Sequence, residues 1–179
     1  MHGTLFLALD KSHAKTSLAA RRAAYNYLGD EGFTPFTRFG GCADSYCVGG
    51  RASCTLAWMR LEREQPEAFR AFTSAYRPSR PLKERIATFR KVFPDYKGMV
   101  PVDRDEDAPE YSYPYDGLLM DKHLYEALKD GFAEVFDYGS EDDDKPCVLY
   151  RGEDDDWDWP EDTTKLIGRT WVVVFDYHF

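Results

Sequence analysis

The segment that decides the fold is residues 168–179, GRTWVVVFDYHF. In a strand, alternate side chains point to opposite faces of the sheet. One face here would carry five aromatic or branched side chains: Trp171, Val173, Phe175, Tyr177 and Phe179. Val172 and Val174 make the other face apolar as well. A strand that is apolar on both faces belongs in the interior of a sheet, so we expect this strand to be central and near the first strand.

The rest of the chain alternates strand and helix signals around that segment. Residues 3–10, GTLFLALD, place leucines on alternate positions and predict a first strand. Residues 33–54 are rich in Gly and aromatics, and SYCVGG is their most strand-like part. Capping residues and apolar stripes predict four helices, from Thr16 or Ser17 to Gly29 or Gly32, over 66–76, over 81–93, and from Asp121 onward.

Within the first of these helices, the stripe of Ala20, Ala24 and Tyr27 is expected to face the core, with Arg21 and Arg22 pointing elsewhere. The 179 residues are expected to form a single α+β domain spanning 1–179. Its sheet should be small and mainly antiparallel, with the first and last strands near each other and about four helices covering it. A long surface loop is expected over 94–117, and acidic loops over 140–145 and 153–162.

Charge is distributed unevenly along the chain. Residues 1–100 hold sixteen Lys and Arg against nine Asp and Glu, whereas residues 101–179 hold seven against twenty-three. The two parts therefore carry net charges of +7 and −16. Such an asymmetry indicates an electrostatic partner.

The basic residues concentrate in segment 60–97, with ten Lys and Arg against five acids. This segment could be the polar face of two amphipathic helices, could contact nucleic acid, or could pair with the acidic half within the chain or across a homodimer. The net charge of −9 argues against direct nucleic-acid binding.

The acidic stretch 151–162, RGEDDDWDWPED, holds seven carboxylates and two tryptophans. Asp154, Asp156 and Asp158 imitate the first ligands of an EF-hand loop, but Trp159 stands at the glycine position and Lys165 at the bidentate glutamate position. A calcium site of that form is therefore excluded, whereas a looser Mg²⁺ or Ca²⁺ site stays an open alternative. Paired-carboxylate catalysis would need partners fixed by packing, which a surface run does not supply.

Two readings of this stretch stay open. It could be a solvated loop whose tryptophans fold back on the core. It could also be a binding surface, because spaced carboxylates imitate nucleic-acid phosphates and Trp is a frequent interface anchor. The second reading predicts a protein partner with a basic nucleic-acid-binding groove, and no metal or cofactor. Its predicted binding residues are Asp142, Asp143, Asp144, Glu153, Asp154, Asp155, Asp156, Trp157, Asp158, Trp159, Glu161 and Asp162.

A second candidate site is the turn Gly49, Gly50 and Arg51. Successive amides in a glycine turn could hold an anion. The alternative, which the sequence favours, is a hairpin turn or bulge in which the glycines are structural and Arg51 pairs with an acid such as Asp44.

Cysteines stand at 42, 47, 54 and 147, and the first three are separated by four and six residues. Zinc sites favour tighter pairs, so buried free thiols are expected. No signal peptide or apolar span is visible, which predicts a cytosolic protein without membrane contact. His178 lies two residues from Asp176 on the last strand. With Cys47 or Cys54 it could serve a small hydrolase or transferase, which is the alternative function.

Three patches carry a resemblance: ALDKSHAKTSLAARRAAYNYL near the N-terminus, ADSYCVGGR in the middle, and WVVVFDYHF at the end. Together they resemble small phage and mobile-element proteins of uncharacterised function. In those proteins a Trp is expected soon after Gly-Gly-Arg, where this chain has Ala52 and Ser53. The resemblance implies a setting in which small acidic proteins often inhibit host defence, as anti-CRISPR proteins do.

Overall fold

The computed structural model describes residues 2–30, 45–102, 112–135 and 166–178, and all statements below concern these residues. Four strands occur: β1 (His2–Asp10), β2 (Ser45–Val48), β3 (Gly117–Leu119) and β4 (Thr170–His178). Five α-helices occur: α1 (Ser17–Asp30), α2 (Thr55–Glu64), α3 (Pro66–Ala75), α4 (Leu82–Val92) and α5 (Lys122–Val135). Short 3₁₀ turns follow β1 (Lys11–His13), follow β2 (Gly50–Ala52) and precede β3 (Pro114–Asp116).

β4 is the central strand of the sheet, as its two apolar faces predict. It pairs antiparallel with β1 along its whole length, from His2 opposite His178 to Asp10 opposite Thr170. On its other edge β4 pairs antiparallel with β2 over one half and with β3 over the other half. The predicted α+β fold, with an antiparallel sheet and the first and last strands paired, is confirmed.

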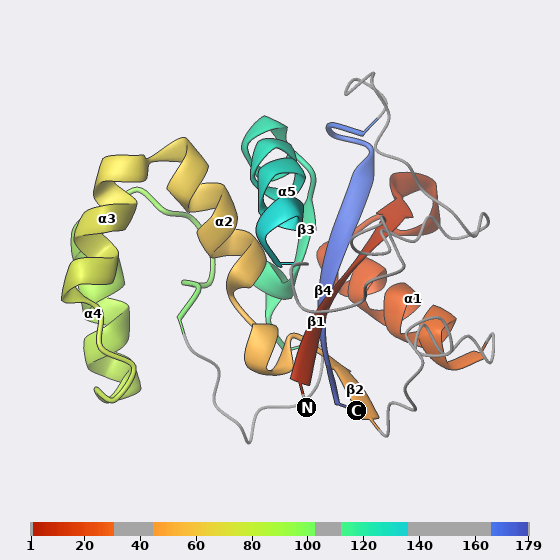
Figure 1. Cartoon of the computed structure of the whole chain (residues 1–179), viewed down its shortest axis with the longest axis horizontal. Coiled ribbons are helices and arrows are strands. Elements are labelled where there is room, and N and C mark those ends of the chain that lie inside the picture. The colour runs from red at the N-terminus through yellow and green to blue at the C-terminus, as the bar shows by residue number, and fades with distance from the viewer. Residues whose placement is uncertain (1, 31–44, 103–111, 136–165, 179) are drawn as a thin grey trace.

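Helices cover both faces of the sheet (Figure 1). On one face Val173 and Phe175 pack with Ala20 and Ala24 of α1. On the other, Val172 and Val174 pack against a cluster supplied by α2 and α5 that consists of Leu56, Leu124, Tyr125 and Leu128. The predicted stripe of α1 is therefore confirmed at Ala20 and Ala24. No helix in the described ranges combines the length and apolar character that a bilayer crossing requires.

Several helix starts follow the predicted capping chemistry. Thr16 Oγ1 accepts the Ala19 amide at 3.2 Å, and Asp121 Oδ1 accepts the Leu124 amide at 2.8 Å. Pro66 occupies the first position of α3, and Pro81 immediately precedes α4.

Three features differ from expectation. Arg21 was expected to point away from the core, which is wrong, because it is only 3 % exposed. Helix α2 was not predicted at all. Segment 94–117 was expected to be a surface loop, but Val100 and Tyr115 are buried and the segment ends in the first residue of β3.

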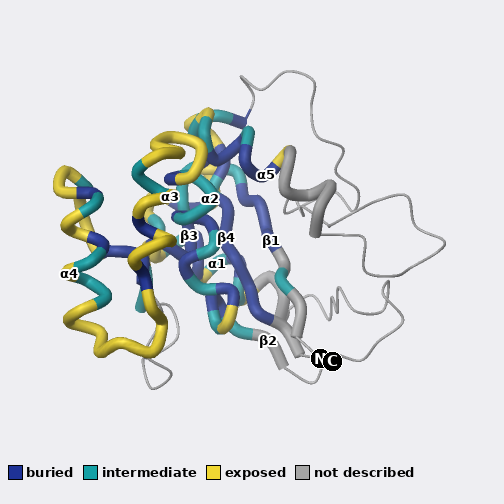
Figure 2. Tube along the Cα trace, turned by 60° about the vertical axis from the view of Figure 1, so that its left-hand side comes forward, coloured by how far each residue is buried: buried dark blue, intermediate teal, exposed yellow. Residues whose placement is uncertain are grey.

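Helices α3 and α4 form a hairpin on the far side of α2 from the sheet (Figure 1). Its interior is an aromatic cluster in which Phe72 contacts the rings of Trp58, Phe69, Tyr76, Phe89 and Phe93. Edge-on and tilted ring contacts of this kind add stability beyond the buried area. The hairpin is attached to the domain through Trp58 and Leu61 of α2, while its outer surface is largely exposed (Figure 2).

Candidate functional site

The predicted partner-binding residues of the acidic loops lie outside the described residues. This holds for Asp142–Asp144 and for the whole run from Glu153 to Asp162. The second predicted site, the turn Gly49, Gly50 and Arg51, is described in full.

This turn lies where two short strands meet against the edge of β4. β2 ends at Val48, and the Gly49 amide then donates to the Val174 carbonyl at 2.9 Å, which adds one rung to the ladder. β3 begins one residue further along the same edge, where Gly117 stands opposite Val173. The residue after β2 and the residue before β3, which is Asp116, are thereby brought together.

One amide of the turn bonds a carboxylate of the chain itself, and a second carboxylate packs against the turn. The Arg51 amide donates to Asp176 Oδ2 at 2.8 Å. Gly49 (φ +75°) and Gly50 (φ +52°) both have left-handed conformations, and each packs directly on a carboxylate, Asp116 and Asp176 respectively. Asp44, the acid suggested by the sequence, lies outside the described residues. The turn is therefore a structural junction that packs on two carboxylates of the chain, Asp116 and Asp176.

Asp116 connects three parts of the fold while being only 2 % exposed. Its carboxylate accepts the Ser53 hydroxyl at 2.9 Å and the Cys54 amide at 3.1 Å. These two residues immediately precede α2, so Asp116 caps that helix from another segment, where negative charge also meets the positive end of the helix dipole. Nothing in the local sequence of α2 signals this cap.

The cation beside Asp116 is Arg21, which comes from α1. Burial lowers the pKa of the Arg21 guanidinium, while the Asp116 charge opposes that shift and Arg22 adds to it. Arg21 also packs against Gly117, where any larger side chain would meet its Cγ. This buried charged group joins α1 to the β3 edge of the sheet.

The fold brings together some, but not all, of the residues predicted for the alternative function, a hydrolase or transferase. Cys47 stands directly opposite Asp176 in the β2–β4 register, and both border Gly50. His178 stands opposite Ser45, two positions along β4. Cys54, in contrast, is buried and its thiol donates to the Val102 carbonyl, which makes it a poor nucleophile. Neither Cys47 nor Cys54, the two cysteines in the described ranges, forms a disulfide.

Charge is separated between the described and the remaining residues. The described residues carry eighteen Lys and Arg against thirteen Asp and Glu, a net charge of +5. The remaining residues carry five against nineteen, a net charge of −14. The α3–α4 hairpin with its following turn, residues 66–97, holds eight basic residues and three acids. The net negative charge of the chain thus comes from residues outside the described ranges.

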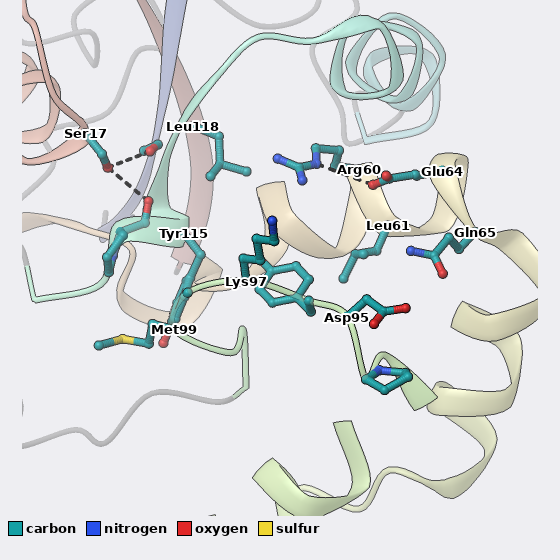
Figure 3. A pocket seen from close by; sticks show the side chains of 15 residues that line it. Ser17, Arg60, Leu61, Glu64, Gln65, Asp95, Lys97, Met99, Tyr115 and Leu118 are labelled. Carbon is teal, nitrogen blue, oxygen red and sulfur yellow. Dashed lines mark hydrogen bonds and ion pairs between the residues drawn. The ribbon is translucent and has the colours of Figure 1, made fainter. Parts of the chain in front are cut away.

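A cleft of about 570 Å³ opens between α2, residues 94–99 and the start of β3 (Figure 3). Arg60 and Lys97 are among the side chains that line it. This cleft could not be predicted from the sequence, because its walls come from segments far apart in the chain. Within the described residues, no group of three His, Cys, Asp or Glu side chains is placed to hold a metal ion.

Comparison with known proteins gave no match, whether with family models, with curated proteins or with solved structures.

Proposed function

We propose that this chain is an interaction protein whose acidic segment 153–162 occupies a basic nucleic-acid-binding groove on a partner protein. The proposed setting is a phage or other mobile element, and the proposed target is a nucleic-acid-handling protein of host defence, such as a CRISPR effector. The carboxylates alone would be attracted to any basic groove. Trp157 and Trp159 would act as anchors that make binding specific for one partner.

The separation of charge is the observation that carries this proposal. The described residues carry a net charge of +5 and the remaining residues −14, and a concentrated run of carboxylates suits a basic groove. The buried acids Asp116 and Asp176 hold the junction together. They are therefore not available to a partner, and we assign the binding charge to the residues outside the described ranges.

The alternative, a cysteine-dependent hydrolase or transferase, is supported by Cys47 lying opposite Asp176. Asp176 is only 7 % exposed and its carboxylate already accepts the Arg51 amide. A buried carboxylate that already accepts a backbone amide suits a structural role better than the role of orienting a catalytic base. We therefore prefer the interaction function.

The test compares two variants with the same change in charge. In the first, Asp154, Asp155, Asp156 and Asp158 are replaced by Asn. In the second, four exposed acids of the packed domain are neutralised: Glu62→Gln, Glu67→Gln, Glu84→Gln and Asp95→Asn. Tagged wild-type and variant proteins are used to capture partners from nuclease-treated bacterial lysate, with elution along a salt gradient. The captured protein is then purified and tested for binding to nucleic acid.

We expect wild type and the second variant to retain a partner that moderate salt releases, and the first variant to lose it. The wild-type chain should also compete with nucleic acid for that partner. Equal capture by both variants, or a partner that binds no nucleic acid, would contradict the proposal. Matching far-UV circular dichroism of all three proteins controls for folding.

A further inference from the structure

The cleft between α2 and β3 has walls that are fixed before any ligand arrives. On one side, the Arg90 guanidinium donates to the Tyr96 carbonyl and, at 2.9 Å, to the Gly98 carbonyl. On the other, Ser17 Oγ lies 2.7 Å from the Gly117 carbonyl and donates to it. Each wall is therefore tied to a helix, α4 or α1, and a ligand would not have to order the cleft. A volume of about 570 Å³ suits a small molecule.

Two cations face each other across this cleft. Figure 3 shows the Lys97 side chain reaching from the 94–99 segment toward Arg60 of α2. Arg60 makes its ion pairs through Nε, at 3.4 Å to Asp121 and 3.8 Å to Glu64. Lys97 is exposed and makes no ion pair among the described residues. Asp121 and Glu64 offset part of the Arg60 charge, so an anion in the cleft would be attracted mainly by Lys97, with the remaining N–H groups of the Arg60 guanidinium as further donors.

The remaining lining differs between the two ends of the cleft. Tyr115, Leu118 and the half-exposed Met99 provide an apolar end. Glu64, Gln65 and Asp95 provide a polar end on the other side of the two cations (Figure 3). Carboxylates at the polar end would repel a second anionic group there, so a ligand with one anionic group and one apolar group fits this lining best.

We propose that the cleft binds a small organic anion, a carboxylate or a phosphate ester that carries an aromatic or branched apolar group. The anionic oxygens lie between Arg60 and Lys97, and the apolar group lies on Tyr115 and Leu118. This activity is independent of the acidic segment and of the proposed protein partner.

The test uses anilinonaphthalene sulfonate, an aromatic anion whose fluorescence rises in an apolar site. Phenyl phosphate, benzoate and inorganic phosphate are then added as competitors. The test variant is Lys97→Gln, which changes an exposed side chain. The matched control is Lys91→Gln on α4, which removes the same charge from an exposed position outside the cleft.

We expect Lys97→Gln to weaken probe binding about three- to fivefold, at the upper end of what the loss of one exposed ionic contact predicts, and Lys91→Gln to leave it unchanged. Phenyl phosphate or benzoate should displace the probe, and the stronger of the two identifies the anionic group. Inorganic phosphate should compete weakly because it lacks the apolar part.

Three results would overturn the proposal. The first is unchanged binding in Lys97→Gln, and the second is an equal loss in Lys91→Gln, which would indicate general charge attraction. The third is the absence of saturable probe binding to the wild-type chain. Met99→Ser gives an independent check. This variant should bind phenyl phosphate more weakly, while its binding of inorganic phosphate should not change.

Discussion

Glycine at position 50 is required by two demands that act together. Its φ of +52° is a left-handed conformation, and a Cβ there would come within 2.6 Å of Asp176 Oδ2 and 2.7 Å of Cys47 Sγ. Gly168 has a similar φ of +73° but has open space around it. The two positions therefore separate backbone strain from steric overlap.

We predict that Gly50→Ala lowers the free energy of unfolding by about 2–4 kcal/mol, from left-handed strain plus overpacking. Gly168→Ala should lower the free energy of unfolding by only about 1 kcal/mol, because it adds left-handed backbone strain without steric overlap. Urea denaturation of both variants checks this. Equal losses would mean that the junction moves aside to accept the methyl group.

Tyr115 is predicted to make the fold sensitive to alkali. Burial, and then the neighbouring Cys54 and Asp116, raise the pKa of its hydroxyl well above the ordinary value of 10.0. The unfolded chain releases this proton above pH 10 while the folded chain keeps it, so stability is intact below that pH and falls as pH rises.

For each pH unit above 10, this residue should lower the free energy of unfolding by about 1 kcal/mol. Between pH 9 and pH 11, the free energy of unfolding of Tyr115→Phe should therefore fall less steeply with pH than that of the wild-type chain. Urea denaturation across this range measures it. A variant whose pH dependence matches that of wild type would show that Tyr115 ionises without unfolding. Tyr96, whose pKa is also raised by burial, accounts for part of the slope that remains.

At the scale of elements, the helices with local capping signals were predictable and α2 was not. Thr16, Pro66, Pro81 and Asp121 mark helix starts in the sequence itself. The residue before α2 is Cys54, which has a φ of +76° and no side-chain cap. Its cap comes from Asp116, 62 residues later, so only the tertiary fold reveals it. β3 was missed because three residues are too short for a recognisable alternation.

The α3–α4 hairpin is predicted to unfold separately from the sheet. Phe72 is fully buried at the centre of its aromatic cluster. Phe72→Ala should therefore lower the free energy of unfolding of the hairpin by about 3–5 kcal/mol. Hydrogen exchange should accelerate over residues 66–92 while β4 keeps its protection. Thr73→Ala, at an exposed neighbouring position, is the control. Uniform acceleration across the chain would show that the hairpin and the sheet unfold together.

For the whole molecule, the apolar pattern of β4 was enough to predict the centre of the fold, since burial on both faces is encoded locally. The junction could not be predicted in the same way. The sequence suggested an anion site or, with preference, a structural turn at Gly49, Gly50 and Arg51, but the bond from the Arg51 amide to Asp176 spans 125 residues. Which carboxylate fills such a turn depends on strand register, and that is set only when the sheet assembles.

The central position of β4 has a consequence for how the protein is made. β1, β2 and β3 all pair with this one strand, and β1 is synthesised first. While the chain grows on the ribosome, the edge of β1 that pairs with β4 has no partner until residues 170–178 emerge. Pairing across such sequence distances is slow, and exposed strands invite aggregation. The nascent chain should therefore depend on chaperones until its last strand is available.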